Sequence, residues 1–388
     1  MDLTEYEKDA LDGKKGETLE IAYRILTAVG EAMGSDRLIP IRWTHVSGVN
    51  YNTIGDAGEE FLSKFSENAN VRIMTTLNPT GYDIDKIQNY DLDENFISKQ
   101  ESINNSYKKM GVIPTFSCIP YELYGLPAQN TQVSFAESNA AIHANSVDFL
   151  KTNKESAFSA LASAITGKSI YSNIRQQNLD TPEISIRCKF NIQNELECGI
   201  LGYFAGQTSK KFVNIDGLYE IDQIETKSLC GGIGTSGQCI KYTLNESKKP
   251  KEKIDFDKKD FQNIYDELNT SENGDVIVLG SPQLGMKELS NLSCMLNNKK
   301  FTKPCMIFCP RTVKNQASVL GYNNKLEHAG CEILSNCCAC FTPLLTRKNI
   351  DSVITNSVKG SYYLKHKNKL HTNIKSLKNI IDENTKIN

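Results

Sequence analysis

Cysteine is the residue type in this sequence with the clearest capacity for chemistry. The 388 residues include 12 cysteines, and three of these fall within four positions, at Cys337, Cys338 and Cys340. Cys118 lies apart, in a loop stiffened by two prolines. In a reducing compartment such thiols pack in the core or bind metal rather than form disulfides. The spacing lacks the two CxxC-like pairs of a zinc ribbon, so core packing and another kind of metal centre are the two interpretations.

Glycines at 232, 234 and 237 satisfy the GxGxxG pattern of dinucleotide-binding proteins. The residues before them do not read as a buried strand, and those after them favour a strand rather than a helix. We therefore reject a dinucleotide site and predict a close-packed or ligand-contacting turn. The sequence has no Walker A, HExxH or nucleophile-elbow motif. His45 and His143 lie near candidate loops, and we expect packed histidines there.

Helices and strands must position these residues, and the first of them are predicted in the N-terminal part. A capping box at Thr4 and Glu7 marks the first helix, and a second capping signal occurs at Asp56 and Glu59. Further predicted helices span 19–33, 56–65, 96–110, 137–150 and 155–165, and predicted strands span 38–46 and 71–77. From 183 to 245 the pattern changes to strands and glycine-rich turns, followed by a charged linker over 247–253.

After residue 255, short apolar strands alternate with helical stretches. The predicted strands are 276–280, 306–309, 332–335 and 353–356. This alternation indicates βαβ units and a mostly parallel sheet. Ligands of such sheets lie beyond the carboxyl ends of the strands. The residues at those ends are 47–50, 78–79, 281–283, 310–312, 336–338 and 357–359, and small, polar and thiol side chains are common among them.

Composition excludes several classes of function. The net charge is -2 and the pI about 6.3, so there is no overall basic field for nucleic acid. No apolar run approaches the ~20 residues that span a bilayer, and residues 1–16 do not resemble a signal peptide. We therefore expect a cytoplasmic protein that binds neither nucleic acid nor membrane. The Lys-rich segment 365–378 is expected to be a solvated, partly frayed helix.

Five long stretches stand out: HVSGVNYNTIGDAGEEFL (45–62), TTLNPTGYD (75–83), MGVIPTFSCIPY (110–121), FAESNAAIHANS (135–146) and TNKESAFSALASAITGK (152–168). These stretches resemble the aconitase X family. Weaker similarity continues through 275–283 and around Cys338 and Lys359, so the resemblance covers about residues 3–365. The VSGV, IGDAG and LNPTG versions are similar to the archaeal phosphomevalonate dehydratase large subunits rather than to the hydroxyproline dehydratases.

The resemblance implies a hydro-lyase of the archaeal mevalonate pathway, which makes isoprenoid precursors. The implied reaction is loss of water from (R)-5-phosphomevalonate to give trans-anhydromevalonate 5-phosphate. The implied cofactor is a [4Fe-4S] cluster held by three cysteines, which leaves one iron free to act as a Lewis acid. The implied partner is a small subunit with a swivelling domain, giving a heterodimer, and the catalytic base can lie on that partner.

Residue by residue, the resemblance assigns two kinds of role. Substrate contacts fall on Gly48, Val49, Asn50, Asn78, Pro79, Glu137, Ser138 and Lys359. Cluster ligands fall on Cys118 and Cys338. The family's other cysteine falls on Ser281, and a serine oxygen is a poorer ligand for iron–sulfur than a thiolate. The third ligand is therefore Ser281, Cys337 or Cys340, or the cluster is altered or missing.

The expected fold is α/β, with an aconitase-like large-subunit architecture of parallel βαβ sheets and a β-rich middle region. Its parts are an N-terminal region with the substrate loops and first cluster cysteine (1–182), the β-rich region and linker (183–253), a C-terminal region with the second cluster cysteine (254–365) and a basic tail (366–388). Two other functions are carried forward. One is a hydro-lyase on another hydroxy acid, such as cis-3-hydroxy-L-proline, and the other is a cluster-poor binding subunit without catalysis.

Overall fold

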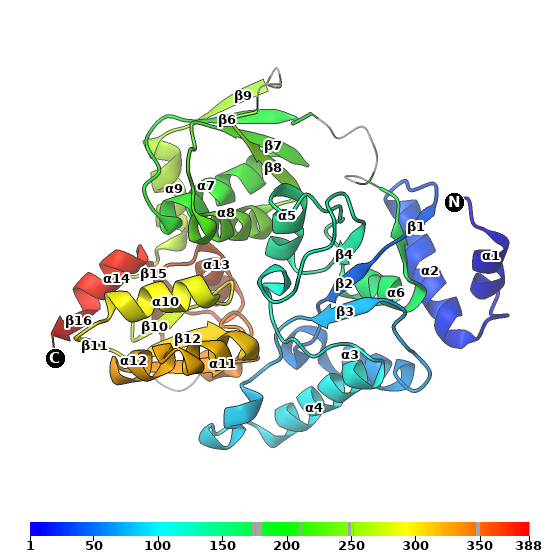
Figure 1. The fold of residues 1–388 in the computed structure, drawn as a ribbon, viewed down its shortest axis with the longest axis horizontal. Helices are drawn as coiled ribbons and strands as arrows, with labels where there is room; N and C mark the ends of the chain where they lie inside the picture. Colours follow the sequence, from blue (N-terminus) through cyan, green and yellow to red (C-terminus); the bar gives the residue numbers. More distant parts are fainter. Residues whose placement is uncertain are drawn as a thin grey trace.

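The computed structural model describes residues 1–172, 175, 181–209, 211–246, 250, 252–346 and 350–387. The chain forms three α/β parts (Figure 1): an N-terminal part that runs from blue through cyan to the green of α6, a green to yellow-green middle part and a yellow to red C-terminal part. Among the described residues, every strand pairing within the three larger sheets is parallel. The predicted α/β class is confirmed. None of the described helices combines the length and apolar character needed to cross a bilayer.

The N-terminal part is built on a sheet of order β3-β2-β4. Its strands are β2 (Trp43–Val46), β3 (Met74–Leu77) and β4 (Val133–Phe135), and β1 (Leu38–Pro40) pairs antiparallel with β5 (Lys168–Ile170). Its helices are α1 (Glu5–Leu11), α2 (Glu17–Ala32), α3 (Tyr51–Phe65), α4 (Glu94–Lys109), α5 (Ser138–Ser146) and α6 (Ala157–Thr166). The predicted Thr4–Glu7 capping box is confirmed. The single strand predicted over 38–46 is wrong. The segment forms two strands, β1 and β2, because Pro40 has no backbone amide to donate and ends the first of them.

The C-terminal part holds a five-stranded sheet of order β13-β12-β10-β14-β15. These strands are β10 (Val276–Leu279), β12 (Cys305–Cys309), β13 (Cys331–Ser335), β14 (Ser352–Thr355) and β15 (His371–Ile374). Helices α10 (Met286–Met295), α11 (Arg311–Val319), α12 (Tyr322–His328), α13 (Val358–His366) and α14 (Leu377–Asn384) pack on it, and β11 (Lys299–Phe301) pairs with β16 (Thr385–Ile387).

The solvated, partly frayed helix predicted for the Lys-rich segment 365–378 is wrong. Strand β15 lies beside β14, and Ile380 and Ile381 of α14 are fully buried. The frequent lysines made the segment resemble a solvated helix. In the structure the apolar side chains between them face the core, while the lysine ammonium groups reach solvent.

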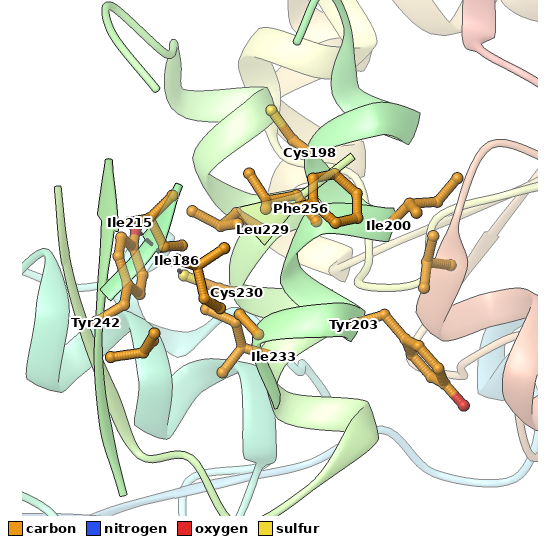
Figure 2. Packing of buried hydrophobic residues seen from close by; sticks show 14 of the residues in the cluster. Ile186, Cys198, Ile200, Tyr203, Ile215, Leu229, Cys230, Ile233, Tyr242 and Phe256 are labelled. Carbon is orange, nitrogen blue, oxygen red and sulfur yellow. Dashed lines mark hydrogen bonds between the residues drawn. The ribbon is translucent and has the colours of Figure 1, made fainter. Parts of the chain in front are cut away.

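The middle part holds the four described strands β6 (Ile184–Cys188), β7 (Phe212–Asp216), β8 (Lys241–Leu244) and β9 (Glu252–Phe256), in the order β8-β7-β6-β9. Helices α7 (Glu195–Thr208), α8 (Gln223–Ser236) and α9 (Lys258–Leu268) cover it. Figure 2 shows apolar side chains of α7 and α8, such as Cys198 and Leu229, packed with Phe256 of β9. Strand β9 belongs to this sheet, so the predicted boundary at 253 falls too early. The predicted linker 247–253 lies partly outside the described residues.

The glycine-rich turns predicted for the middle part are wrong, because those segments are helices. A side chain at Gly202 would place its Cβ 2.4 Å from the Leu229 carbonyl oxygen, and one at Gly232 would lie 2.2 Å from the Gly199 carbonyl oxygen. Each glycine lowers helix propensity by about 1 kcal/mol, which made turns the natural prediction. Here the glycines let the backbones of α7 and α8 approach closely, and the GxGxxG motif begins inside α8.

Candidate active site

The carboxyl ends of the N- and C-terminal sheets meet at one place. The Thr80 amide, just after β3, donates to the carbonyl oxygen of Asn336, just after β13, at 2.8 Å. The backbone amide of Gln283, just after β10, donates to the Cys118 sulfur at 3.2 Å. Residues from strand ends far apart in the sequence are thereby brought together. The strand-end segment 310–312 is an exception, because Arg311 forms a surface ion pair with Asp85 at 2.8 Å.

A cavity of about 450 Å³ opens beside this junction. All eight residues to which the resemblance assigned substrate contacts line it: Gly48, Val49, Asn50, Asn78, Pro79, Glu137, Ser138 and Lys359. Its wall also includes three aromatic residues that the sequence did not single out, Phe158, Phe341 and Tyr363. The volume is typical of a site for a small molecule.

Four helices begin at the cavity wall, α3, α5, α6 and α13. The N-cap Asn50, the first residues Ser138 and Ala157, and Lys359 at the start of α13 all line the cavity. A helix N-terminus carries partial positive charge and unpaired amides, so it favours anions. Three of these helices directly follow a parallel strand, which is why strand ends located the residues.

A buried ion pair lies in the cavity wall. The Lys359 ammonium donates to Glu137 Oε1 and, at 2.5 Å, to Asn139 Oδ1. The Asn78 amide donates to the other Glu137 oxygen at 2.8 Å. The sequence did not single out Asn139, since nothing local marks an asparagine that reaches across to another strand end.

The pair holds both groups in their charged forms. Burial works to raise the pKa of the Glu137 carboxyl, but the Lys359 ammonium and the Asn78 hydrogen bond hold it below its ordinary value. Burial works to lower the pKa of the Lys359 ammonium, but the Glu137 carboxylate raises it above its ordinary value. An ammonium and a carboxylate therefore stand as a fixed ion pair at the cavity wall across the neutral pH range.

His45 supports the pair from behind. Its Nε2 lies 2.9 Å from Asn78 Oδ1 and its Nδ1 lies 2.8 Å from Thr76 Oγ1. The Asn78 oxygen can only accept, so Nε2 carries the proton. Burial lowers the pKa of His45 to about 4, which keeps the ring neutral. His143 stacks on Tyr121 with the ring centres 3.8 Å apart, so both histidines are packed, as predicted.

The loop 47–50 has a backbone that only certain residues permit. Gly48 has φ +75°, and a Cβ there would lie 2.7 Å from the Ala157 Cβ. Asn50 caps α3 by accepting from the Asn52 amide at 2.9 Å, and its own amide donates to the Phe341 carbonyl oxygen at 3.1 Å. The helix predicted to start at Asp56 therefore begins earlier, with a kink at Gly55.

The thiols collect next to this cavity. Burial raises the pKa of the Cys118 thiol, the nearby Cys338 thiol and Glu137 add to the effect, and Lys359 opposes it. A hydrogen bond that the Cys338 thiol donates to Cys340, together with burial, raises the pKa of Cys338. Ser281 Oγ lies 2.9 Å from Cys340 Sγ. Three thiols and one hydroxyl from three separate loops thus lie near one another.

In their chemistry, the thiol donors suit an iron–sulfur cluster. In the part of the chain that the structure describes, no three His, Cys, Asp or Glu side chains are arranged to hold one metal ion. Soft thiol donors select iron–sulfur clusters, zinc or copper(I). A cluster is larger than one ion and accepts thiolates that stand farther apart, and three protein ligands suit an iron with an open position.

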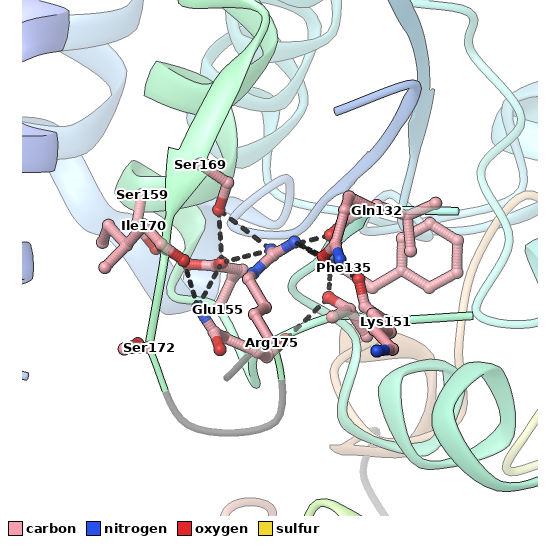
Figure 3. Close-up of polar contacts among 12 residues, drawn as sticks. Gln132, Phe135, Lys151, Glu155, Ser159, Ser169, Ile170, Ser172 and Arg175 are labelled. Atoms are coloured by element: carbon pink, nitrogen blue, oxygen red, sulfur yellow. Dashed lines mark hydrogen bonds and ion pairs between the residues drawn. The ribbon is translucent and has the colours of Figure 1, made fainter. Parts of the chain in front are cut away.

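A buried arginine network fixes β4, the strand that precedes Glu137 in the chain (Figure 3). The guanidinium of Arg175 donates to the Val133 carbonyl oxygen at 2.7 Å and to Ser169 Oγ at 2.9 Å, and lies 3.4 Å from Glu155. It thereby joins β4 and β5 to the segment before α6. No local pattern marks Arg175 in the sequence, since an isolated arginine is normally a surface residue.

Comparison with known proteins shows the family. Residues 1–174 match the model of the aconitase X first domain, and residues 274–386 match that of the third domain. The crystal structure of a holo-form aconitase X from Thermococcus kodakaraensis superposes with a TM-score of 0.90 at 29% identity, covering 99% of this chain and 100% of that one. The chain belongs to the aconitase X family, as the sequence motifs indicated.

Curated relatives carry two names. The phosphomevalonate dehydratase large subunit of Methanocaldococcus jannaschii is 34% identical, covering 94% of this chain and 95% of the relative. That of Methanosarcina mazei is 30% identical over 94% of this chain and 92% of the relative. The cis-3-hydroxy-L-proline dehydratase of Hypocrea jecorina is more distant, at 25% identity over 91% of this chain and 63% of the relative.

Proposed function

We propose that this chain is the catalytic large subunit of a hydro-lyase that converts (R)-5-phosphomevalonate to trans-anhydromevalonate 5-phosphate. The observation that carries the proposal is the Lys359 ammonium at a cavity where four helices begin, beside a group of buried thiols. The names of the relatives with 28–34% identity support the same reaction.

The cavity suits a substrate with two anionic groups. Lys359 binds the carboxylate, and the N-termini of the helices beginning at the wall bind the phosphate. The rings of Phe158, Phe341 and Tyr363 cover the carbon skeleton and exclude water. Cis-3-hydroxy-L-proline carries one carboxylate and a cationic amine. Four helix N-termini at the wall, each with partial positive charge, therefore favour the phosphorylated acid over hydroxyproline.

We propose that Cys118 and Cys338, with a third donor, hold a [4Fe-4S] cluster. When bound, the cluster supplies a Lewis acid for the departing hydroxyl group. The ion pair of Glu137 and Lys359 keeps its neighbours fixed and orients the carboxylate, because both partners are buried and hydrogen-bonded from a second side.

The proton acceptor is proposed to lie on a small partner subunit, giving a heterodimer. Among the described residues of the cavity wall, the titratable groups are Glu137, Lys359 and Tyr363. Glu137 has a lowered pKa, while burial raises the pKa of Tyr363. None is tuned toward neutral pH, where a general base is most effective. The relatives named as large subunits support the same arrangement.

The same proposal places the protein in the cytoplasm. All 12 cysteines lie in the described residues and are free thiols, as expected in a reducing compartment. A cluster with an open iron also needs protection from oxidants.

One experiment tests the function. The chain is purified anaerobically with its small subunit, and iron, sulfide and turnover of phosphomevalonate and cis-3-hydroxy-L-proline are measured. We expect bound iron and sulfide and turnover of phosphomevalonate alone. Turnover of hydroxyproline alone would overturn the substrate assignment. A folded complex without iron and without turnover would support the cluster-poor binding subunit instead.

A further inference from the structure

The thiol group contains two proposed cluster ligands, Cys118 and Cys338, and a three-ligand cluster needs a third donor. The resemblance puts it at Ser281, directly after β10, where this chain has a hydroxyl instead of a thiol. In the structure the Ser281 hydroxyl does not stand alone, because its Oγ lies 2.9 Å from the sulfur of Cys340, 59 positions away in the chain. A thiol therefore occupies space next to the position that lacks one.

The neighbouring cysteine does not compete for this place. Cys337 is fully buried in the hydrophobic cluster of the C-terminal sheet, packed with residues such as Phe308 and Leu334, and Ala339 lies in the same cluster. Cys338 and Cys340 belong to none of the hydrophobic clusters found in the described residues. Side chains thus alternate along 337–340, two toward the core and two toward the site.

We propose that Cys340 supplies the third thiolate of the iron–sulfur cluster, in place of a thiol at position 281. The inference rests on the proposed function, since it presupposes the cluster. An iron–sulfur bond forms at Cys340 Sγ, the thiol proton passes to solvent, and no change of oxidation state is needed. The hydrogen bond between Cys338 and Cys340 is given up in the process.

The same geometry assigns a role to Ser281. Its hydroxyl can donate to the Cys340 thiolate across the observed contact, and hydrogen bonds to cluster sulfurs influence the reduction potential. Ser281 is then a positioning residue for a ligand rather than a ligand. This accounts for a hydroxyl at a site where an iron–sulfur ligand should be soft.

The test compares variants of the full complex, reconstituted anaerobically with iron and sulfide. The readouts are iron and sulfide per chain, the electron paramagnetic resonance spectrum of the reduced cluster, and circular dichroism to confirm folding. Cys340→Ala should lose most of its iron, while Cys337→Ala, the matched control, should keep it. Adding Ser281→Cys to Cys340→Ala should restore the cluster, since it puts a thiol back after β10.

The outcomes separate this inference from the function. If Cys340→Ala holds as much iron as the wild type and Ser281→Ala loses it, the serine oxygen is the ligand and the inference is wrong, although the proposed function stands. Loss of iron in folded Cys337→Ala would likewise overturn it. A wild-type complex that takes up no iron would overturn the cluster and the inference together.

Discussion

The substrate cavity and the thiol group lie side by side but are held in different ways. In the cavity, each charged group has a partner of opposite character from a different strand end, as with Lys359 and Glu137. In the thiol group, the donors contact one another, as Ser281 does Cys340. Because the partners in the cavity are fixed by helix starts and strand ends, few other residues can replace them. In the thiol group, a cysteine at a different position can serve as a ligand, provided that its sulfur still reaches the cluster.

The largest expected effect tests the thiol group. Cys118→Ala removes a ligand, and the metal contributes several kcal/mol to the reaction. We therefore expect turnover to fall at least ~1,000-fold, at a tenfold change per 1.36 kcal/mol. The measurement is turnover together with iron content. Cys309→Ala is the control, because Cys309 is a buried thiol of β12 outside the site, and it should keep both. Equal iron in the two variants would remove Cys118 from the ligand set.

The next effect tests the cavity. Lys359→Met removes a charged donor, and hydrogen bonds to charged groups contribute ~1.5–3 kcal/mol, so kcat/KM should fall by about 100-fold. It also leaves Glu137 buried without its counter-ion, which should lower the free energy of unfolding by ~3–5 kcal/mol.

The double variant Lys359→Met with Glu137→Gln separates the two consequences. Without the buried charge it should regain most of the stability measured by thermal unfolding, but kcat/KM should stay low. A double variant that recovers both would show that Lys359 acts on folding alone and does not bind substrate.

A smaller effect concerns pH. The pKa of His45 falls from 6.5 to about 4 on folding because the ring is buried. Between these values the unfolded chain binds more protons than the folded one, so stability decreases as the pH falls from 6.5 toward 4. The full effect of this group is about 3 kcal/mol. His45→Gln should flatten the slope of unfolding free energy against pH, and His328→Gln, at an exposed position, should leave it unchanged. An unaltered slope in His45→Gln would assign the pH dependence to other groups.

The smallest effect sharpens the view that helix starts build the cavity. Asn50→Ala removes the cap of α3 and should cost ~1 kcal/mol of stability. Asn50→Asp keeps the accepting oxygen and loses the donor to Phe341, so it should recover most of that stability. Thermal unfolding measures both. Equal losses in the two variants would show that the contact with Phe341 matters more than the cap.

The sequence predicted the elements around the cavity well, because strand ends and capping residues are local signals. The βαβ alternation after residue 255 put Lys359 at the carboxyl end of a predicted strand, and the predicted strand 71–77 did the same for Asn78. Local signals gave the wrong prediction for α7 and α8. Their glycines favour turns in an isolated segment, and they are compatible with helices here because the two helices pack closely together. Local signals also failed for β15, a buried strand that lies between Lys369 and Lys375.

By itself the sequence determined that this is an α/β chain with a polar, thiol-bearing edge and the motifs of the aconitase X family. Only the tertiary structure decided which sulfur lies next to Ser281, which residues hold Glu137 charged, and that Arg175 is buried beneath β4. The reason is physical. Periodicity and capping act over a few residues, whereas the Ser281–Cys340 contact joins positions 59 apart, and such a contact exists only once the sheets have packed.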